Sequence, residues 1–191
     1  AADEQTEANV LLPDGLTMDD LRNLLVINGK TLTLPTTLNK IMELDDKFSY
    51  KAEYADEKSP LYNGKQKGFY VDVLYDNELM FITAFPSDEN NINKILDENI
   101  YHASFGKINC IETDIDVNTS CGLNFNSPNE DIINTFGEPN KYDLQRSNRS
   151  YEFYDDTYTC DLTFKLSTED KIIRVRILFK TNDKIDENQH E

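Results

Sequence analysis

The stretch Ser127–Tyr142, SPNEDIINTFGEPNKY, carries signals for both ends of a short amphipathic helix. Ser127 or Asn129 is a suitable N-cap, and Pro128 fits the first helical position. Apolar side chains recur at helical spacing, at Ile132, Ile133 and Phe136. Gly137 favours the positive φ of a helix C-terminus, and the proline two residues later prevents continuation. The stretch therefore predicts a helix that packs one apolar side against the rest of the chain.

The segments that follow this helix indicate three strands, Ser150–Tyr154, Thr157–Leu166 and Lys171–Lys180. Short polar turns separate them, which is typical of an antiparallel meander. We expect the helix and the meander to share one core, and we expect these side chains to be largely buried: Ile132, Ile133, Phe136, Tyr158, Leu162, Phe164, Ile173, Val175 and Ile177.

The segments before this helix show a similar order of elements. Thr17 and Asp20 form a capping-box pattern, and Asn28-Gly29 between two apolar runs predicts a hairpin. A second helix is expected after Pro35, then a strand at 48–54, a loop at 59–67, a hairpin over 69–85 and a short helix within 87–99. Tyr101–Val117 is expected to hold two strands around Gly106.

This order predicts an α+β fold, an antiparallel sheet with short helices packed on one face, in two tandem similar units. The expected organisation is a polar leader with a short helix (1–23), a first α+β unit (24–100), a second α+β unit (101–180) and a polar tail (181–191). Each unit has a strand containing Ile-Asn, a helix near a proline and an antiparallel meander, although sequence identity between the units is slight.

Composition limits the classes of partner. The formal net charge is −17, and a surface this acidic repels the phosphates of nucleic acids and anionic lipids. No segment approaches the roughly 20 apolar residues that a membrane-spanning helix needs, so no direct membrane insertion is expected. A solvated acidic surface that keeps the protein soluble explains the charge, and a role in binding a cation or a cationic partner is the alternative.

Two short motifs resemble those of known families. Phe125–Tyr142, with its Phe-Gly-Glu-Pro exit before a meander, resembles the helix units of the beta-lactamase inhibitor protein-like fold and of related small bacterial envelope lipoproteins. Ile27–Leu38 is similar to uncharacterised secreted proteins of Gram-positive bacteria, although the first half has Leu44-Asp45-Asp46 where the Phe-Gly-x-Pro exit would stand. The resemblance implies an extracellular or cell-surface binding module, with a signal peptide or lipid anchor expected upstream of Ala1, and it carries over no catalytic residues.

The residues themselves show no catalytic or metal-binding motif. Of the two histidines, only His102 lies outside the tail, and no nucleophile motif accompanies it. Asp114-Ile-Asp116-Val-Asn118 resembles the start of a calcium loop, but the glycine and glutamate that such a loop requires are missing, and the alternation suits a strand with Ile115 and Val117 inward. We therefore expect no cofactor and a non-enzymatic protein. The alternative is a hydrolase whose carboxylates converge only in the fold.

The three cysteines are an odd number, so at least one is free or pairs with another chain. Cys160 alternates with apolar residues and is expected to be a buried, inert thiol. A short-loop disulfide between Cys110 and Cys121 is left open, because sequence spacing does not give the geometry.

The most suitable binding surface is an exposed sheet face flanked by the loops Tyr54–Lys67 and Lys141–Arg149. Both loops are less acidic than the chain as a whole and carry tyrosines, which favour protein interfaces. We expect a protein partner to bind there, through the following residues: Tyr62, Lys65, Tyr142, Arg146 and Arg149. The alternative is that both loops are merely solvated connections. The sequence does not decide the oligomeric state.

Overall fold

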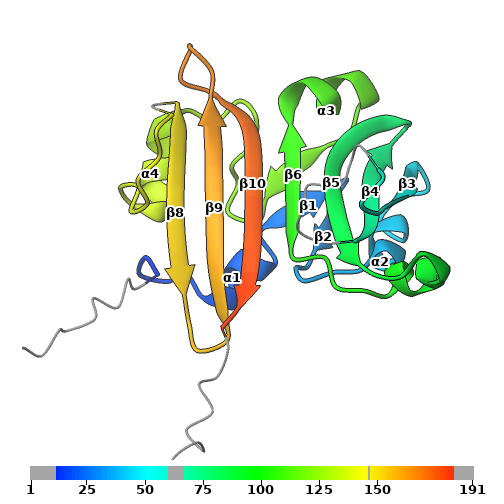
Figure 1. Ribbon diagram of the computed structural model, residues 1–191. Coiled ribbons are helices and arrows are strands. Elements are labelled where there is room, and N and C mark those ends of the chain that lie inside the picture. Colours follow the sequence, from blue (N-terminus) through cyan, green and yellow to red (C-terminus); the bar gives the residue numbers. More distant parts are fainter. Residues whose placement is uncertain (1–11, 60–66, 146, 183–191) are drawn as a thin grey trace, which may run out of the picture.

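Three antiparallel sheets and five short helices make up the part of the chain that the computed structural model describes, residues 12–59, 67–145 and 147–182 (Figure 1). The predicted α+β class is therefore confirmed. No helix within these residues is long and apolar enough to cross a membrane.

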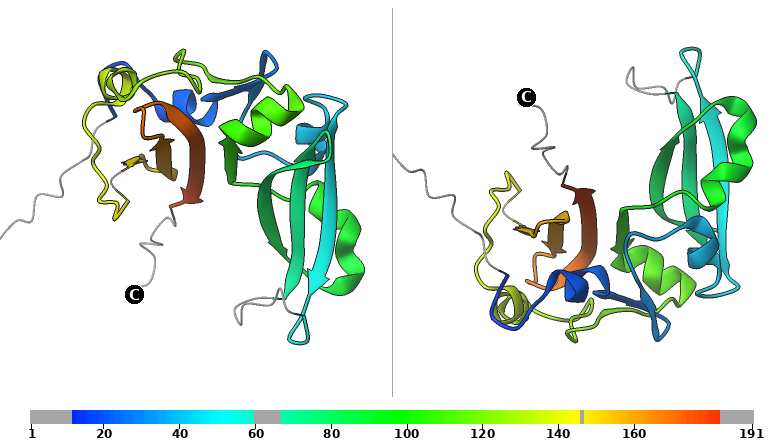
Figure 2. Two further views of the ribbon diagram at one scale, coloured as in Figure 1. Left: turned by 90° about the horizontal axis from the view of Figure 1, so that it is seen from above. Right: turned by 90° about the horizontal axis from the view of Figure 1, so that it is seen from below.

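The largest sheet has four strands in the order β6-β10-β9-β8. The meander β8 (Asn148–Tyr154), β9 (Tyr158–Leu166) and β10 (Ile172–Thr181) is the predicted one, and β6 (His102–Gly106) pairs with the other side of β10. Helix α4 (Asn129–Phe136) covers one face of this sheet (Figures 1 and 2).

Helix α4 ends as predicted but begins differently. Gly137 has φ 77° and its N–H donates to the Ile133 carbonyl at 2.8 Å. At the other end Pro128 occupies the N-cap position, and no side chain caps the helix. The hydroxyl of Ser127 instead accepts a hydrogen bond from the Asn124 N–H, so the prediction that Ser127 or Asn129 caps α4 was wrong.

The second sheet has the order β3-β4-β5, with β3 at Phe48–Ala55, β4 at Gly68–Tyr75 and β5 at Glu78–Pro86. Asp76 and Asn77 both have positive φ in the β4–β5 turn, which confirms the predicted hairpin. The predicted helix after β5 is a 3-10 helix, η1 (Glu89–Leu96), which lies beside this sheet at the right-hand end of the molecule in Figure 2.

The smallest sheet joins strands from distant parts of the chain, in the order β2-β1-β7. Asn28 and Gly29, with φ 49° and 77°, make the predicted hairpin between β1 (Leu25–Ile27) and β2 (Lys30–Leu32). The third strand, β7 (Val117–Thr119), is about ninety residues away in sequence and pairs antiparallel with β1. Helix α1 (Met18–Arg22) precedes this hairpin and has the predicted capping box, and α2 (Leu38–Met42), capped by Thr37, follows it.

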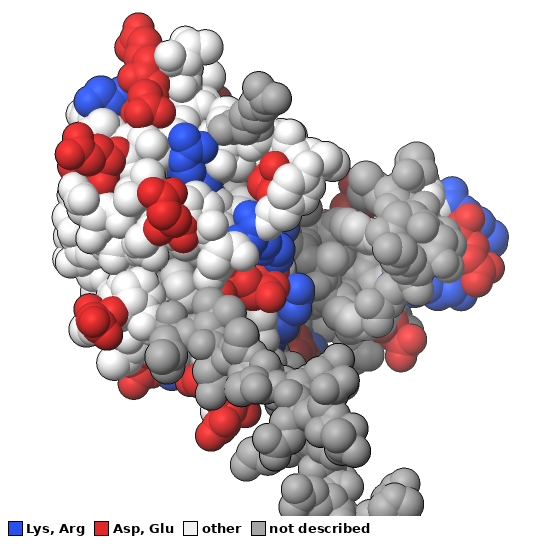
Figure 3. Space-filling model, turned by 90° about the vertical axis from the view of Figure 1, so that its left-hand side faces the viewer, with Lys and Arg blue, Asp and Glu red and all other residues white. Residues whose placement is uncertain are grey.

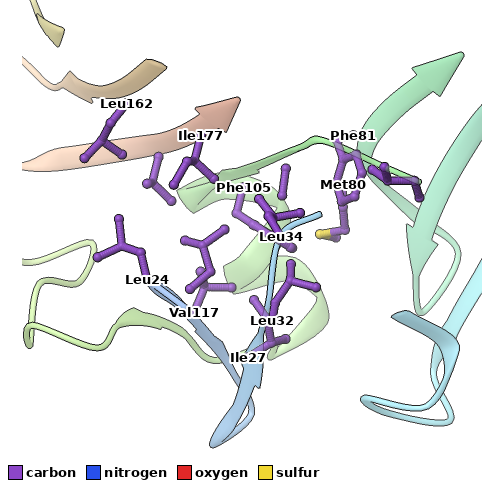
Figure 4. Packing of buried hydrophobic residues seen from close by; sticks show 14 of the residues in the cluster. Leu24, Ile27, Leu32, Leu34, Met80, Phe81, Phe105, Val117, Leu162 and Ile177 are labelled. Atoms are coloured by element: carbon purple, nitrogen blue, oxygen red, sulfur yellow. The ribbon is translucent and has the colours of Figure 1, made fainter. Parts of the chain in front are cut away.

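One hydrophobic core serves all three sheets. In Figure 4 Leu34 lies between Ile177 of β10 and Phe81 of β5, and Leu24 and Ile27 belong to the same cluster. The two halves of the chain therefore share their interior and one sheet, and an internal repeat stays a prediction.

One expected strand is a helix. After β6 the chain turns at Gly106 into α3 (Lys107–Thr113), where a second strand was predicted. Cys110 and Thr113, three residues apart, face inward, and Asp114 ends the helix in the left-handed conformation with φ 56°. The β-branched residues of this segment suit a strand locally, but the helical spacing of its buried residues decides the outcome.

The predicted core of the second half is largely confirmed, since six of the nine side chains named above are buried. Ile133, Tyr158 and Ile173 are only half-buried. A bulge in the β9–β10 register between Ile172 and Arg174 turns Ile172 inward in place of Ile173.

Side chains bond to backbone groups of one edge strand in each larger sheet, β5 and β8; the two sheets adjoin each other along β6 and β5 in Figure 1. The His102 ring Nε2 lies 2.8 Å from the Ile82 carbonyl, and the Asn109 amide donates to the Leu79 carbonyl at 2.8 Å. On the far edge, the Asn140 side chain donates to the Glu152 carbonyl at 3.0 Å and accepts from its N–H at 2.7 Å. These bonds occupy backbone groups that an exposed edge would offer to another strand.

The Phe136 ring should be the main anchor of α4. It is buried, with its centroid 5.6 Å from the rings of both Tyr151 and Phe164. Phe136→Ala should therefore cost about 3–5 kcal/mol of unfolding free energy, the usual range for an emptied aromatic site. Urea denaturation measures this cost, and a variant as stable as the parent would mean that α4 contributes little to the core.

The Asn28 side chain joins three other segments to the β1–β2 hairpin. Its Nδ2 donates to the Asp45 carboxylate at 2.8 Å and to the Tyr75 hydroxyl at 2.9 Å, and its Oδ1 accepts from the Asp116 N–H at 2.9 Å. The Asn28 N–H also donates to the Asp116 carbonyl, directly before β7. The residue therefore positions the α2–β3 connection, β4 and β7 around one turn.

Two substitutions should separate the hydrogen bonds of Asn28 from its backbone conformation. Asn28→Gly keeps the positive φ but removes the side-chain bonds, at a cost of about 1–3 kcal/mol. Asn28→Ala should cost about 1 kcal/mol more, because alanine is disfavoured in the left-handed region. Urea denaturation of both variants measures the difference. A glycine variant with parental stability would show that the side-chain bonds contribute nothing.

Candidate functional site

The predicted loop at 141–149 displays two large side chains on a fixed backbone. Tyr142 and Leu144 are 87% and 86% exposed. Between them, the Asp143 carboxylate accepts hydrogen bonds from the Asn148 amide at 2.9 Å, the Ser150 hydroxyl at 3.0 Å and the Gln145 N–H at 2.8 Å. These bonds lower the pKa of Asp143, that from Asn148 most of all. These bonds fix the backbone around Asp143, while the side chains of Tyr142 and Leu144 stand in solvent.

The other residues predicted for binding have different surroundings. Arg149 is half-buried on β8, where its Nε donates to Asn129 Oδ1 at 2.6 Å and its Nη1 to the Asn148 carbonyl at 3.1 Å, so it also links β8 to the start of α4. Tyr62, Lys65 and Arg146 lie outside the described residues, so their part in binding stays a prediction.

The positive charge at the start of this loop is paired within the fold. Lys141 Nζ lies 2.6 Å from Asp161 and 3.3 Å from Glu152, and these partners, Asp161 first, raise the pKa of Lys141. Lys180 makes a second ion pair with Asp161 at 3.3 Å. Figure 3 shows acidic side chains spread over this side of the molecule, with a few basic ones between them. The exposed side chains of Tyr142 and Leu144 therefore distinguish this surface better than its charge does.

A hollow lies between α3, β7 and the 124–126 segment, and we call it the α3–β7 cleft. Its volume is about 460 Å³. Cys110, Val117 and Phe125 give it apolar walls, and Asp114 and Asp116 stand exposed at its rim. The sequence predicted a strand where α3 lies and showed a calcium-like pattern at residues 114–118. No local pattern indicated that α3 and β7 would enclose a cleft.

Burial affects the buried thiols and the one histidine outside the tail. Burial raises the pKa of the Cys110 thiol to about 12 and raises that of Cys160 further. All three cysteines are free, so the Cys110–Cys121 disulfide does not form, and the predicted burial of Cys160 is confirmed. His102 is engaged with the Ile82 carbonyl, and burial lowers its pKa.

The acidic residues converge little. Among the described residues, no group of three or more His, Cys, Asp or Glu side chains could hold a metal ion. Glu152 and Asp161 face each other across β8 and β9 as a cross-strand pair, but Lys141 lies between their carboxylates. Lys141 therefore offsets the repulsion between these two carboxylates and ties them together at the surface of the sheet.

Comparison of the chain with models of protein families, with curated proteins and with solved structures finds no match.

The half-buried His102 should make stability depend on pH. Its pKa is lowered from 6.5, mainly by burial, so the unfolded chain takes up this proton first as pH falls. The stabilisation is present above pH 6.5 and is lost as pH falls below it, so the protein should be less stable at pH 5.5 than at pH 7.5. Carboxylates protonate mostly below this window.

Urea denaturation of the parent and of His102→Gln at both pH values checks this prediction. Glutamine can still donate to the Ile82 carbonyl but does not titrate, so the variant should lose less stability on acidification. An equal loss in both proteins would show that other groups carry the pH dependence.

Proposed function

We propose that this protein is a non-enzymatic binding or scaffolding module of the bacterial cell envelope and that its 141–149 loop holds a protein partner. The observation that carries this proposal is the nearly complete exposure of Tyr142 and Leu144 on a backbone fixed by Asp143. A backbone segment already held by hydrogen bonds loses little further conformational entropy on binding, and tyrosine is enriched among the residues that dominate interfaces.

The position of the loop also favours recognition by shape. Lys141 N–H donates to the Ser150 carbonyl at 3.1 Å, which attaches the start of the loop to the edge of β8. Asn140 and Lys141 therefore occupy backbone groups of that edge, and a partner would meet side chains here more than free backbone. An apolar pocket on the partner would suit Tyr142 and Leu144.

The setting outside the cytoplasm rests on the sequence. The resemblance of Phe125–Tyr142 to units of envelope lipoproteins supports it, and the acidic surface is compatible with an exposed, soluble domain. We do not favour the hydrolase alternative, because the cross-strand carboxylate pair Glu152 and Asp161 is bridged by Lys141.

Affinity capture from an envelope extract of the producing cells tests the proposal. The bait is the full chain, and the test variant is Tyr142→Ala/Leu144→Ala. Ile82→Ala/Ile92→Ala is the matched control, because it also removes two exposed apolar side chains, from β5 and η1. The partner retained by the parent should be lost about tenfold or more with the test variant only.

Thermal melting of all three proteins should agree closely, since neither pair lies in the core. Equal retention of the partner by the parent and the folded test variant would overturn the assignment of this loop. Retention of no protein by the parent would overturn the binding function.

A further inference from the structure

The α3–β7 cleft offers an unpaired strand edge. Among the described strands, β7 has β1 as its only neighbour, so its other edge has no strand partner. The bonds from Asn28 N–H to the Asp116 carbonyl and from Ser120 N–H to the Leu24 carbonyl show that even-numbered residues of this stretch point their backbone groups at β1. Because successive residues alternate, the N–H and C=O of Val117 point to the other edge.

The outward edge is closed at one end and open at the other. The Thr119 N–H donates to the Leu123 carbonyl at 2.8 Å, so the segment after β7 already occupies it. Val117 lines the cleft, whose volume of about 460 Å³ leaves room for a short extended segment. Figure 2 shows α3 beside this stretch, away from the 141–149 loop.

The walls of the cleft present an apolar side chain to solvent. Ile111 of α3 is 68% exposed at its rim, and Phe125 is half-buried opposite. The carbonyl of Phe125 accepts a bond of 3.5 Å from Lys107 Nζ, which lies at the α3 side of the cleft. An apolar side chain of a bound segment would therefore find contacts from both walls.

The rim of the cleft favours a cation. Asp114 and Asp116 are both exposed there, and Asn118 donates to the Asp116 carboxylate at 2.8 Å and so holds it in place. Within the described residues, no lysine or arginine is within ion-pair distance of either carboxylate. The net charge of −17 adds attraction for a positively charged partner.

We propose that an extended segment of a partner protein, carrying a lysine or arginine next to an apolar residue, binds in the α3–β7 cleft and pairs with Val117 as an added strand. Backbone hydrogen bonds to the edge would give affinity, and the carboxylates and Ile111 would select the side chains. The site is separate from the 141–149 loop and does not depend on it. A chain with two such surfaces could hold two partners together.

The probe for this proposal is a blocked octapeptide of alternating lysine and valine, with alternating glutamate and valine as its counterpart. Calorimetric titration of the full chain measures affinity, and backbone amide NMR locates the site. The lysine peptide should bind and shift the amide signals of residues 116–118 and of Ile111, whereas the glutamate peptide should not bind.

Two variants test the two parts of the site. Asp114→Asn/Asp116→Asn should weaken binding of the lysine peptide about tenfold. The matched control Asp156→Asn/Glu169→Gln removes the same charge at two exposed turn positions and should change affinity little. Val117→Pro removes the outward N–H, so it should abolish binding while the β1 pairing remains.

Four results would overturn the proposal: no binding of the lysine peptide at millimolar concentration, binding of both peptides, equal weakening by the two charge variants, or shifted signals away from the cleft. If Val117→Pro does not fold, the charge variants and the NMR map still decide the outcome. Capture at the 141–149 loop is measured separately, so either site can fail alone.

Discussion

The hydrogen bonds of the Asn28 side chain set the arrangement on which the other elements depend. They connect the β1–β2 turn to Asp45, Tyr75 and Asp116, and they therefore fix three segments that local sequence does not bring together. The turn needs a residue that tolerates positive φ and also carries a donor and an acceptor, and asparagine meets both needs. With β1 placed, its apolar side chains fill the space between the two larger sheets, and β7 gains its only strand neighbour among the described residues.

Features that depend on a few adjacent residues could be predicted from the sequence. The turns at Asn28-Gly29 and Asp76-Asn77, the end of α4 at Gly137 and the alternation of β8 to β10 all depend on local backbone preferences. Features that depend on distant partners could not. The pairing of β1 with β7, the bulge beside Ile172 and the helical state of Lys107–Thr113 are decided by packing across the core.

The 141–149 loop and the α3–β7 cleft also differ in how far the sequence predicts them. Tyr142 could be singled out because it lies in a polar, irregular stretch, whereas the carboxylate of Asp143 fixes that stretch through contacts with Asn148 and Ser150 that follow only from the start of β8. The α3–β7 cleft has no local signature. Its acidic rim corresponds to the alternating Asp114–Asn118 pattern of the sequence. The wall that makes it a cleft is α3, a segment for which the sequence predicted a strand.

The three cysteines lie at three different depths, and this distribution has a kinetic consequence. Cys121 is exposed, Cys110 is buried beside the α3–β7 cleft, and Cys160 is buried on β9, a central strand of the four-stranded sheet. A thiol-alkylating reagent reaches the first at once, but it reaches each of the others only when its surroundings open. The alkylation rates of Cys110 and Cys160 therefore report how often the cleft and the main sheet open. No cysteine has to be introduced to measure these rates.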